Sequence, residues 1–285
     1  MECEFEEKQY EFPLDMELVE GQKVFIPGSV FEHSLGTDAA LFTRNLRFWR
    51  PWFSWYSFWR LWRRGVYLRP EYWDAIRNEL DSDRFPRFKF NLFLQYKRPE
   101  YISSHRGKEY RQWRQPYFRY AIKEDQQRRL YELEQRVSPN ALVVYACAAF
   151  WRLTHLWEFQ KHRRLVDNSN FVQPHVLQGH RRYTFANPGG SGIAFSEPVK
   201  VKELNLRQAL GQMREREPVF RSNSEFLSKL SWQINEVLKV LPEELREVQR
   251  SMMEHVPDHQ LARSIATISS FTYVTNITWG VGYKK

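Results

Sequence analysis

The sequence contains little cysteine, with only Cys3 and Cys147 among its 285 residues. Two cysteines cannot form the disulfide framework of a small secreted domain, and by themselves they cannot complete a zinc site. Cys147 lies in an apolar run, where a small buried thiol is the usual outcome. We therefore expect a structural role for Cys147 and exclude the class of disulfide-stabilised proteins.

Long apolar runs are also missing from the sequence. The longest, such as residues 141–150, fall well short of the roughly 20 residues that a membrane-spanning helix needs. The first seven residues are rich in glutamate and do not resemble a signal peptide. Apolar residues still make up 42% of the chain, enough to fill the core of one large domain or two modest ones. We expect a globular, cytoplasmic protein without a transmembrane segment.

Acidic residues are outnumbered by basic residues, 34 to 43, which gives a formal net charge of +9 and a pI near 9.5. This balance favours polyanionic partners, either nucleic acid or an anionic membrane surface. Residues 44–70 contain no acidic residue, but they hold seven arginines and five of the eleven tryptophans. The excess positive charge is therefore concentrated in one segment.

Aromatic residues recur at helical spacing within that segment. They follow Pro51, which suits the first turn of a helix, and they are Trp52, Trp55, Tyr56, Trp59 and Trp62. We predict an aromatic-faced helix over residues 52–64. Arg60, Arg63 and Arg64 at its end match the basic and aromatic chemistry that binds nucleic acid. The same stripe also suits a packed core or a membrane surface.

A second group of basic residues lies in a predicted loop near residue 180. Arg181 and Arg182 concentrate hydrogen-bond donors there. They are candidates for lining a phosphate groove, with a solvated basic loop as the alternative.

A predicted strand, helix and second strand follow one another between residues 87 and 147. Residues 87–97 form an apolar strand-like run in which Gln95 and Lys97 project from one face. Residues 124–137 predict a helix with acidic residues in its first turn, and residues 141–147 predict an uncharged strand. This βαβ pattern implies a right-handed crossover and a parallel pair buried on both faces. An amide beside an ammonium at the end of a buried strand is costly unless the pair has a chemical role.

Glu32, Asp38 and the pair Gln95-x-Lys97 occur in that order along the chain. This order resembles the restriction-endonuclease-like PD-(D/E)XK nuclease superfamily, here as a Gln-x-Lys variant. The resemblance covers about residues 28–150 and implies an α/β fold with a mixed sheet core flanked by helices. It also implies a metal-dependent endonuclease, with DNA as the favoured substrate and RNA as the alternative. Such nucleases commonly serve in bacterial defence and restriction.

The resemblance further implies a role for each residue of the motif. Asp38, the Gln95 amide oxygen and the Tyr96 backbone carbonyl would bind Mg²⁺ or Mn²⁺, because these hard cations prefer oxygen ligands. Lys97 would orient or activate the attacking water, and Glu32 would supply an additional carboxylate.

Two alternatives stay open for this site. Gln95 stands where an acidic residue is usual, which weakens metal binding, and Asp81 or Asp83 is an alternative acidic ligand. The alternative function is a non-catalytic nucleic-acid-binding subunit with a degenerate nuclease fold. A protein partner or a homo-oligomer is compatible with either function.

We place a nuclease-like α/β domain over residues 1–198, with the aromatic and basic insertion at about residues 44–88. Within this domain, glycine and proline in residues 168–198 predict a loop. Residues 199–285 form a helical C-terminal subdomain in this interpretation. Its predicted helices cover residues 204–217, 224–241, 243–255 and 259–270. A strand is also predicted over residues 23–26, and a helix over residues 150–166.

Overall fold

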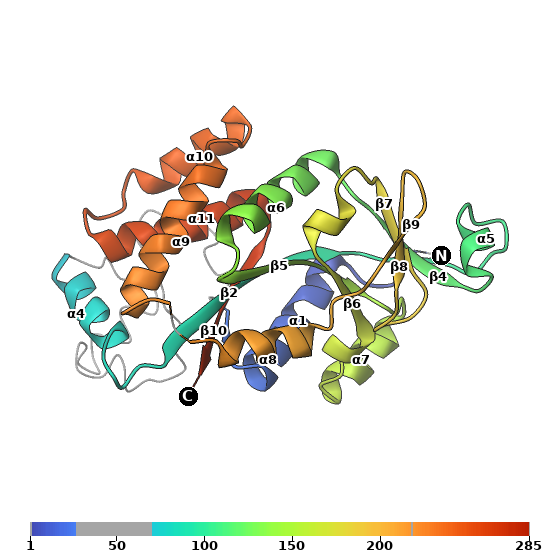
Figure 1. The fold of residues 1–285 in the computed structure, drawn as a ribbon, viewed down its shortest axis with the longest axis horizontal. Coiled ribbons are helices and arrows are strands. Elements are labelled where there is room, and N and C mark those ends of the chain that lie inside the picture. Colours follow the sequence, from blue (N-terminus) through green and yellow to red (C-terminus); the bar gives the residue numbers. More distant parts are fainter. Residues whose placement is uncertain (1, 27–69, 218, 285) are drawn as a thin grey trace. The chain divides into compact units, whose positions relative to one another are not determined.

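The computed structural model describes residues 2–26, 70–217 and 219–284 (Figure 1). Over these residues the chain is a mixed α/β protein with two five-stranded sheets. It divides into two compact units. The first contains residues 1–26, 88–219 and 275–285, and the described part of the second contains residues 70–87 and 220–274. The predicted helix over residues 52–64 lies outside the described residues.

The first sheet is mixed and carries the parallel pair that the sequence predicts. Its strands follow the order β1-β10-β2-β5-β6. Their bounds are β1 (Val24–Phe25), β2 (Arg87–Lys97), β5 (Ala141–Ala148), β6 (Ser169–Val172) and β10 (Thr278–Lys284). β2 and β5 run parallel, with Asn91 opposite Ala141 and Lys97 opposite Cys147. β6 is antiparallel to β5, and β1 is antiparallel to β10.

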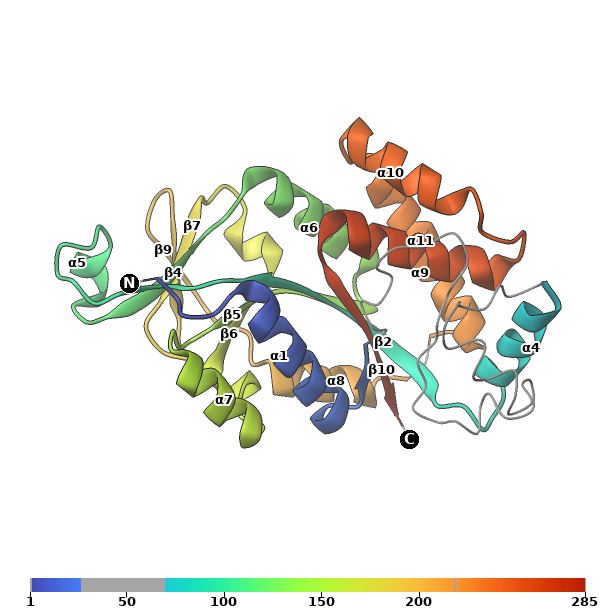
Figure 2. The ribbon, with the colours of Figure 1, turned by 180° about the vertical axis from the view of Figure 1, so that it is seen from behind.

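Helices cover both faces of this sheet. On one face Tyr96 of β2 meets Tyr10 of α1 (Glu7–Gly21), with ring centroids 5.7 Å apart and the rings nearly perpendicular. On the other face lies α6 (Glu124–Val137), the crossover between β2 and β5, whose Gln127 side chain accepts a hydrogen bond from Tyr145. Figures 1 and 2 show α1 and α6 on opposite sides of these strands. Because both faces are covered, β2 is buried from Phe90 to its end.

The second sheet is antiparallel throughout. Its order is β3-β4-β7-β8-β9, with bounds β3 (Glu100–Ile102), β4 (Tyr117–Ala121), β7 (Arg182–Phe185), β8 (Gly192–Phe195) and β9 (Val199–Val201). The prediction of a loop over residues 168–198 is wrong, because β6, β7 and β8 lie there. At Gly192 an added Cβ would come within 2.0 Å of the Tyr183 hydroxyl. This glycine is therefore needed for packing within a strand and does not mark a loop.

The remaining elements of the first unit are short helices and turns. They are α5 (Tyr110–Trp113), α7 (Leu153–Lys161), α8 (Leu206–Glu215), η1 (Val166–Asn168) and η2 (Pro174–Leu177). α7 and α8 are shorter than the helices predicted over residues 150–166 and 204–217. The sequence analysis missed α1, which contains Pro13, and β10, which contains two glycines. At Gly282 a Cβ would lie 2.1 Å from the Phe90 ring, so this strand needs glycine in order to pack against β2.

The described part of the second unit is helical. It contains α4 (Pro70–Leu80), α9 (Asn223–Leu238), α10 (Glu243–Met253) and α11 (Gln260–Thr275). The start of α9 is fixed to the end of α4, because Asn223 Nδ2 donates to the Leu80 carbonyl at 2.8 Å and the Ser224 N–H donates to Asp81 at 2.8 Å. The helices predicted over residues 224–241, 243–255 and 259–270 are confirmed to within a few residues. α8 and β10, from the same predicted subdomain, belong to the first unit.

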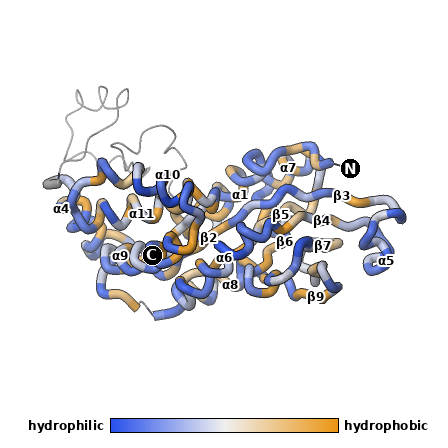
Figure 3. The backbone as a smooth tube through the Cα atoms, turned by 90° about the horizontal axis from the view of Figure 1, so that it is seen from above, coloured by the Kyte–Doolittle hydropathy of each residue, from blue (hydrophilic) through white to orange (hydrophobic). Residues whose placement is uncertain are grey.

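Hydrophilic and hydrophobic residues are mixed along the helices of both units (Figure 3). Among the described residues, no helix has the length and apolar character needed to cross a bilayer.

Candidate functional site

The described residues of the predicted motif lie at the carboxyl end of β2. Gln95 is opposite Tyr145 of β5 and Lys97 is opposite Cys147. Because side chains alternate along a strand, Gln95 and Lys97 share the face that α6 covers, and Tyr96 points to the α1 face. The predicted placement of the Gln-x-Lys pair on one face at the end of a buried parallel strand is confirmed.

Lys97 is only 9% exposed, although it is the last residue of its strand. Its Nζ donates a hydrogen bond to Oε1 of Gln126 on α6 and lies 5.5 Å from the centre of the Tyr145 ring. Burial lowers the pKa of Lys97, the Glu7 carboxylate opposes that change, and the nearby Lys123 ammonium reinforces it. A lysine with a lowered pKa has a larger neutral fraction near pH 7, and only the neutral amine can accept a proton.

Glu7 is the carboxylate that accompanies Lys97. It is the first residue of α1. Burial raises the pKa of Glu7, while the Lys97 ammonium lowers it. Glu7 was not predicted as a site residue, because α1 was not predicted from the sequence. The sequence does hold a signal, the three-residue spacing of Glu6 and Gln9, which form a capping box in which Gln9 Oε1 accepts the Glu6 N–H at 2.8 Å.

Gln95 supplies a buried amide oxygen. Its Oε1 is buried and accepts no hydrogen bond from the residues that the structure describes, while its Nε2 donates to the Tyr96 carbonyl at 3.3 Å. A half-turn of the amide would exchange its oxygen and nitrogen and bring Oε1 beside that carbonyl. In that orientation Gln95 and Tyr96 would offer two neighbouring neutral oxygens, the donor type that Mg²⁺ accepts.

A partly buried acid holds the other side of Tyr96. The Tyr96 hydroxyl donates to Oδ1 of Asp15 on α1. Burial raises the pKa of Asp15 to about 8, against the lowering effect of this hydrogen bond. Asp15 thus positions the strand residue between Gln95 and Lys97 from the opposite face of the sheet.

The acidic metal ligands of the predicted site are not among the residues that can be placed. Glu32 and Asp38 lie outside the described residues. Asp81 accepts hydrogen bonds from the backbone and hydroxyl of Ser224 in the second unit, a structural contact at the start of α9. Asp83 lies in the turn that follows α4. Over the described ranges, no group of three or more His, Cys, Asp or Glu side chains could hold a metal ion.

The predicted nucleic-acid-binding arginines have different surroundings. Arg60, Arg63 and Arg64 lie outside the described residues. Arg181 is exposed, and its backbone pairs with Phe195 in the second sheet. The Arg182 guanidinium lies 3.4 Å from a carboxylate oxygen of Glu109, a residue that is only 2% exposed. Arg182 therefore neutralises a buried acid, and that contact gives it a structural role.

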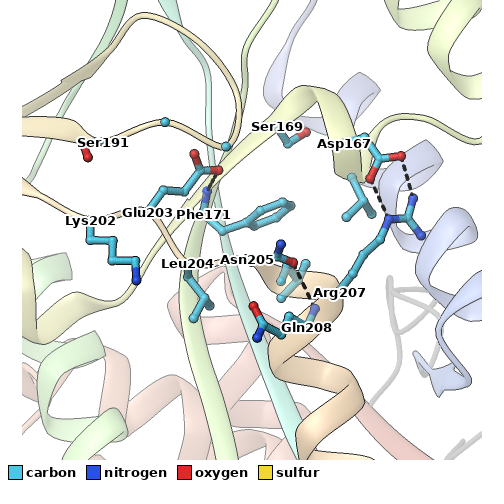
Figure 4. Close-up of a pocket in the computed structure, with 14 residues that line it drawn as sticks. Asp167, Ser169, Phe171, Ser191, Lys202, Glu203, Leu204, Asn205, Arg207 and Gln208 are labelled. Carbon is cyan, nitrogen blue, oxygen red and sulfur yellow. Dashed lines mark hydrogen bonds and ion pairs between the residues drawn. The ribbon is translucent and has the colours of Figure 1, made fainter.

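A hollow of the first unit lies between β6, the loop before β8 and the start of α8 (Figure 4). Its volume is about 850 Å³. Most of its charged side chains already have partners: Arg207 bonds Asp167 at 2.7 Å and Glu17 at 2.8 Å. Lys202 is the exposed exception within the described lining.

Glu203 ties the wall of this hollow to the first sheet. Its Oε1 accepts the Phe171 N–H at 3.3 Å, while its buried Oε2 has no hydrogen-bond partner among the described residues. Burial raises the pKa of Glu203 to about 8, although backbone N–H groups of Phe171, Gly189 and Gly190 and the Asn170 side chain lower it. The carboxyl group lies inside a backbone cradle, and a structural role explains this arrangement.

Comparisons of the chain with protein-family models, curated proteins and solved structures found no match.

Proposed function

We propose that this protein is a metal-dependent nuclease that hydrolyses phosphodiester bonds of DNA, or of RNA, on a restriction-endonuclease-like fold. The observation that carries the proposal is the buried Lys97 at the carboxyl end of a parallel strand, two residues after Gln95. The sequence of β2, α6 and β5 agrees with the core that the motif implies. The net charge of +9 suits a polyanionic substrate.

The donor atoms of the site indicate which residues would bind the metal ion and what the ion would contribute. Mg²⁺ or Mn²⁺, when bound, would neutralise charge on the phosphate and lower the pKa of a bound water. The Gln95 amide oxygen and the Tyr96 carbonyl fit such an ion, and Asp38 is the proposed acidic ligand. Two neutral oxygens alone would hold Mg²⁺ weakly, so the proposal requires at least one carboxylate.

Lys97 is proposed to take the proton of the attacking water. Its Nζ donates one hydrogen bond to Gln126, which leaves the lone pair of the neutral amine free. The water oxygen would bond to phosphorus, the bond from phosphorus to the leaving oxygen would break, and that oxygen would recover a proton. The lowered pKa of Lys97 favours this role near neutral pH.

Glu7 is proposed as a carboxylate of the same site, beside Glu32 or in its place. It is the acid whose charge acts on Lys97 most strongly. A carboxylate near the amine would stabilise the ammonium that forms when Lys97 accepts a proton.

The test is a cleavage assay on labelled single- and double-stranded DNA and RNA, with Mg²⁺ or Mn²⁺ and with chelator. We expect metal-dependent cleavage that Lys97→Ala abolishes while nucleic-acid binding persists. Lys89→Ala is the matched control, because Lys89 lies on the same strand and donates to the Arg216 carbonyl at 3.0 Å. Full cleavage activity in Lys97→Ala would exclude the proposed catalytic role of Lys97.

The second candidate function is a non-catalytic nucleic-acid-binding subunit. The neutral Gln95 and the lack of an acidic cluster in the described part of the chain favour it. It predicts salt-sensitive binding without cleavage under any metal condition. The same assay separates the two functions.

A further inference from the structure

Helix α7 exposes a tryptophan on the surface of the first unit. Trp157 is 60% exposed, whereas its neighbour Leu156 is buried. A single exposed apolar residue is normal on a protein surface and carries no argument alone. Basic residues near Trp157 in the sequence distinguish it from such a residue.

Basic residues lie at both ends of the helix that carries Trp157. Arg152, Lys161 and Arg164 are exposed, and none of them pairs with an acid among the described residues. Lys161 follows Trp157 by four positions, so the two side chains are neighbours on one helical face. Glu158 is the one acidic residue between positions 151 and 164. We call Arg152, Trp157, Lys161 and Arg164 the α7 surface.

The α7 surface begins at the edge of the sheet that carries Lys97. Arg152 follows Cys147 by five positions, and Cys147 is the register partner of Lys97. Trp151 joins the two chain segments that leave this edge, because its ring stacks on Tyr101, with centroids 5.4 Å apart and planes 13° apart. The Arg152 guanidinium lies 4.8 Å from the centre of the same Trp151 ring. Ligands of open α/β sheets bind at the carboxyl ends of the parallel strands.

We propose that the α7 surface binds a single-stranded segment of nucleic acid, with a base stacked on Trp157 and phosphates at the basic side chains. An exposed aromatic ring with a lysine on the same helical face and arginines beyond both helix ends complements a chain of phosphates with accessible bases. A duplex hides its base faces, so the ring selects an unpaired strand. A protein partner would need a wider apolar area, whereas the exposed neighbours Thr154, Glu158 and Gln160 are polar.

This inference deepens the proposed nuclease function by naming where the substrate strand runs, but its test does not depend on cleavage. Fluorescence anisotropy in chelator would measure binding of a labelled thymidine oligonucleotide of about 20 nucleotides and of a duplex of equal length. We expect Trp157→Ala to weaken single-strand binding by about fivefold or more. Trp157→Phe keeps a ring and should retain most of the affinity.

The charge contribution is tested by Lys161→Gln with Arg164→Gln. Each lost phosphate contact should reduce the slope of log affinity against log salt by about 0.7 for a single strand. The matched control is Trp232→Ala with Lys229→Gln in the second unit. Trp232 is 56% exposed and has the Lys229 ammonium 4.1 Å from its ring centre. This control should leave affinity unchanged.

Three outcomes would overturn the inference. They are unchanged affinity in Trp157→Ala, an equal loss in the Trp232 control, and binding to anionic phosphatidylglycerol vesicles without binding to the oligonucleotide. A protein that binds through Trp157 but never cleaves would overturn the proposed nuclease and leave the α7 surface intact.

Discussion

Lys97 and Cys147 are register partners in the parallel pair of β2 and β5, and Asn170 of β6 is in turn the partner of Cys147. Three polar or polarisable side chains therefore form one row across three neighbouring strands on the face that α6 covers. The Asn170 side chain is buried and lies beside the Glu203 carboxyl group, whose pKa it lowers. Burying polar groups inside a sheet is costly unless each finds a partner, and Lys97 finds one in Gln126 of α6.

The first prediction concerns the cost of burying Lys97. Burial lowers its pKa below the ordinary value of 10.5, so the folded state binds the proton less tightly than the unfolded state does. The penalty in the free energy of folding is absent above pH 10.5 and grows as the pH falls from 10.5 toward the folded pKa. It is complete below the folded pKa. Lys97→Met should gain stability over wild type at pH 7 in urea denaturation, and the gain should shrink toward pH 10.5. An equal difference at every pH would contradict this.

Asp15 provides the opposite pH dependence. Its pKa is raised from 3.8 to about 8, so the stability that it contributes is complete below pH 3.8 and is lost as pH rises through about 8. Asp15→Asn keeps an acceptor for the Tyr96 hydroxyl and removes the titration. Because the side chain is only part-buried, we expect the variant to be more stable by about 1–2 kcal/mol at pH 8 and unchanged at pH 4. Thermal unfolding at the two pH values measures this, and no pH dependence in the difference would refute it.

The docking of β10 against β2 is tested at Gly282. A Cβ there would lie 2.1 Å from the Phe90 ring. We expect Gly282→Ala to destabilise the protein by about 1–3 kcal/mol. Gly211→Ala is the control, because its Cβ would meet nothing closer than 3.9 Å within α8 and alanine favours a helix. Equal stability of the two variants in chemical denaturation would place β10 elsewhere.

Both thiols should be unreactive in the folded protein. Cys3 is 4% exposed and Cys147 is fully buried, and burial raises the pKa of each. The thiolate is the reactive form, so alkylation by iodoacetamide at pH 8 should be slow in buffer and should label both cysteines in denaturant. Rapid labelling of Cys147 in buffer would show that the interior beside Lys97 opens.

The sequence predicted the elements whose local signal and tertiary role agree. β2 and β5 contain apolar runs that predict buried strands, and α6 has acidic residues in its first turn. The parallel arrangement of β2 and β5 follows from the crossover rule. The position of Gln95 and Lys97 on one face could also be predicted, since strand alternation alone places both side chains there.

The missed elements carry local signals that their packing overrides. Pro13 lies inside α1 and conceals the helix that brings Glu7 toward Lys97. Glycine at positions 192 and 282 indicates turns, yet each one makes room for an aromatic ring from a neighbouring strand. The partner of Arg182 could not be predicted, because Glu109 reaches it only through the tertiary fold.

Metal-dependent cleavage by wild type, Lys97→Ala and Lys89→Ala, measured beside nucleic-acid binding of the same proteins, tests the central claim most directly. The account predicts cleavage by wild type and Lys89→Ala with Mg²⁺ or Mn²⁺, loss of cleavage in chelator, and loss in Lys97→Ala with binding retained. Cleavage by Lys97→Ala at the wild-type rate, or no cleavage by wild type with any metal, would contradict it.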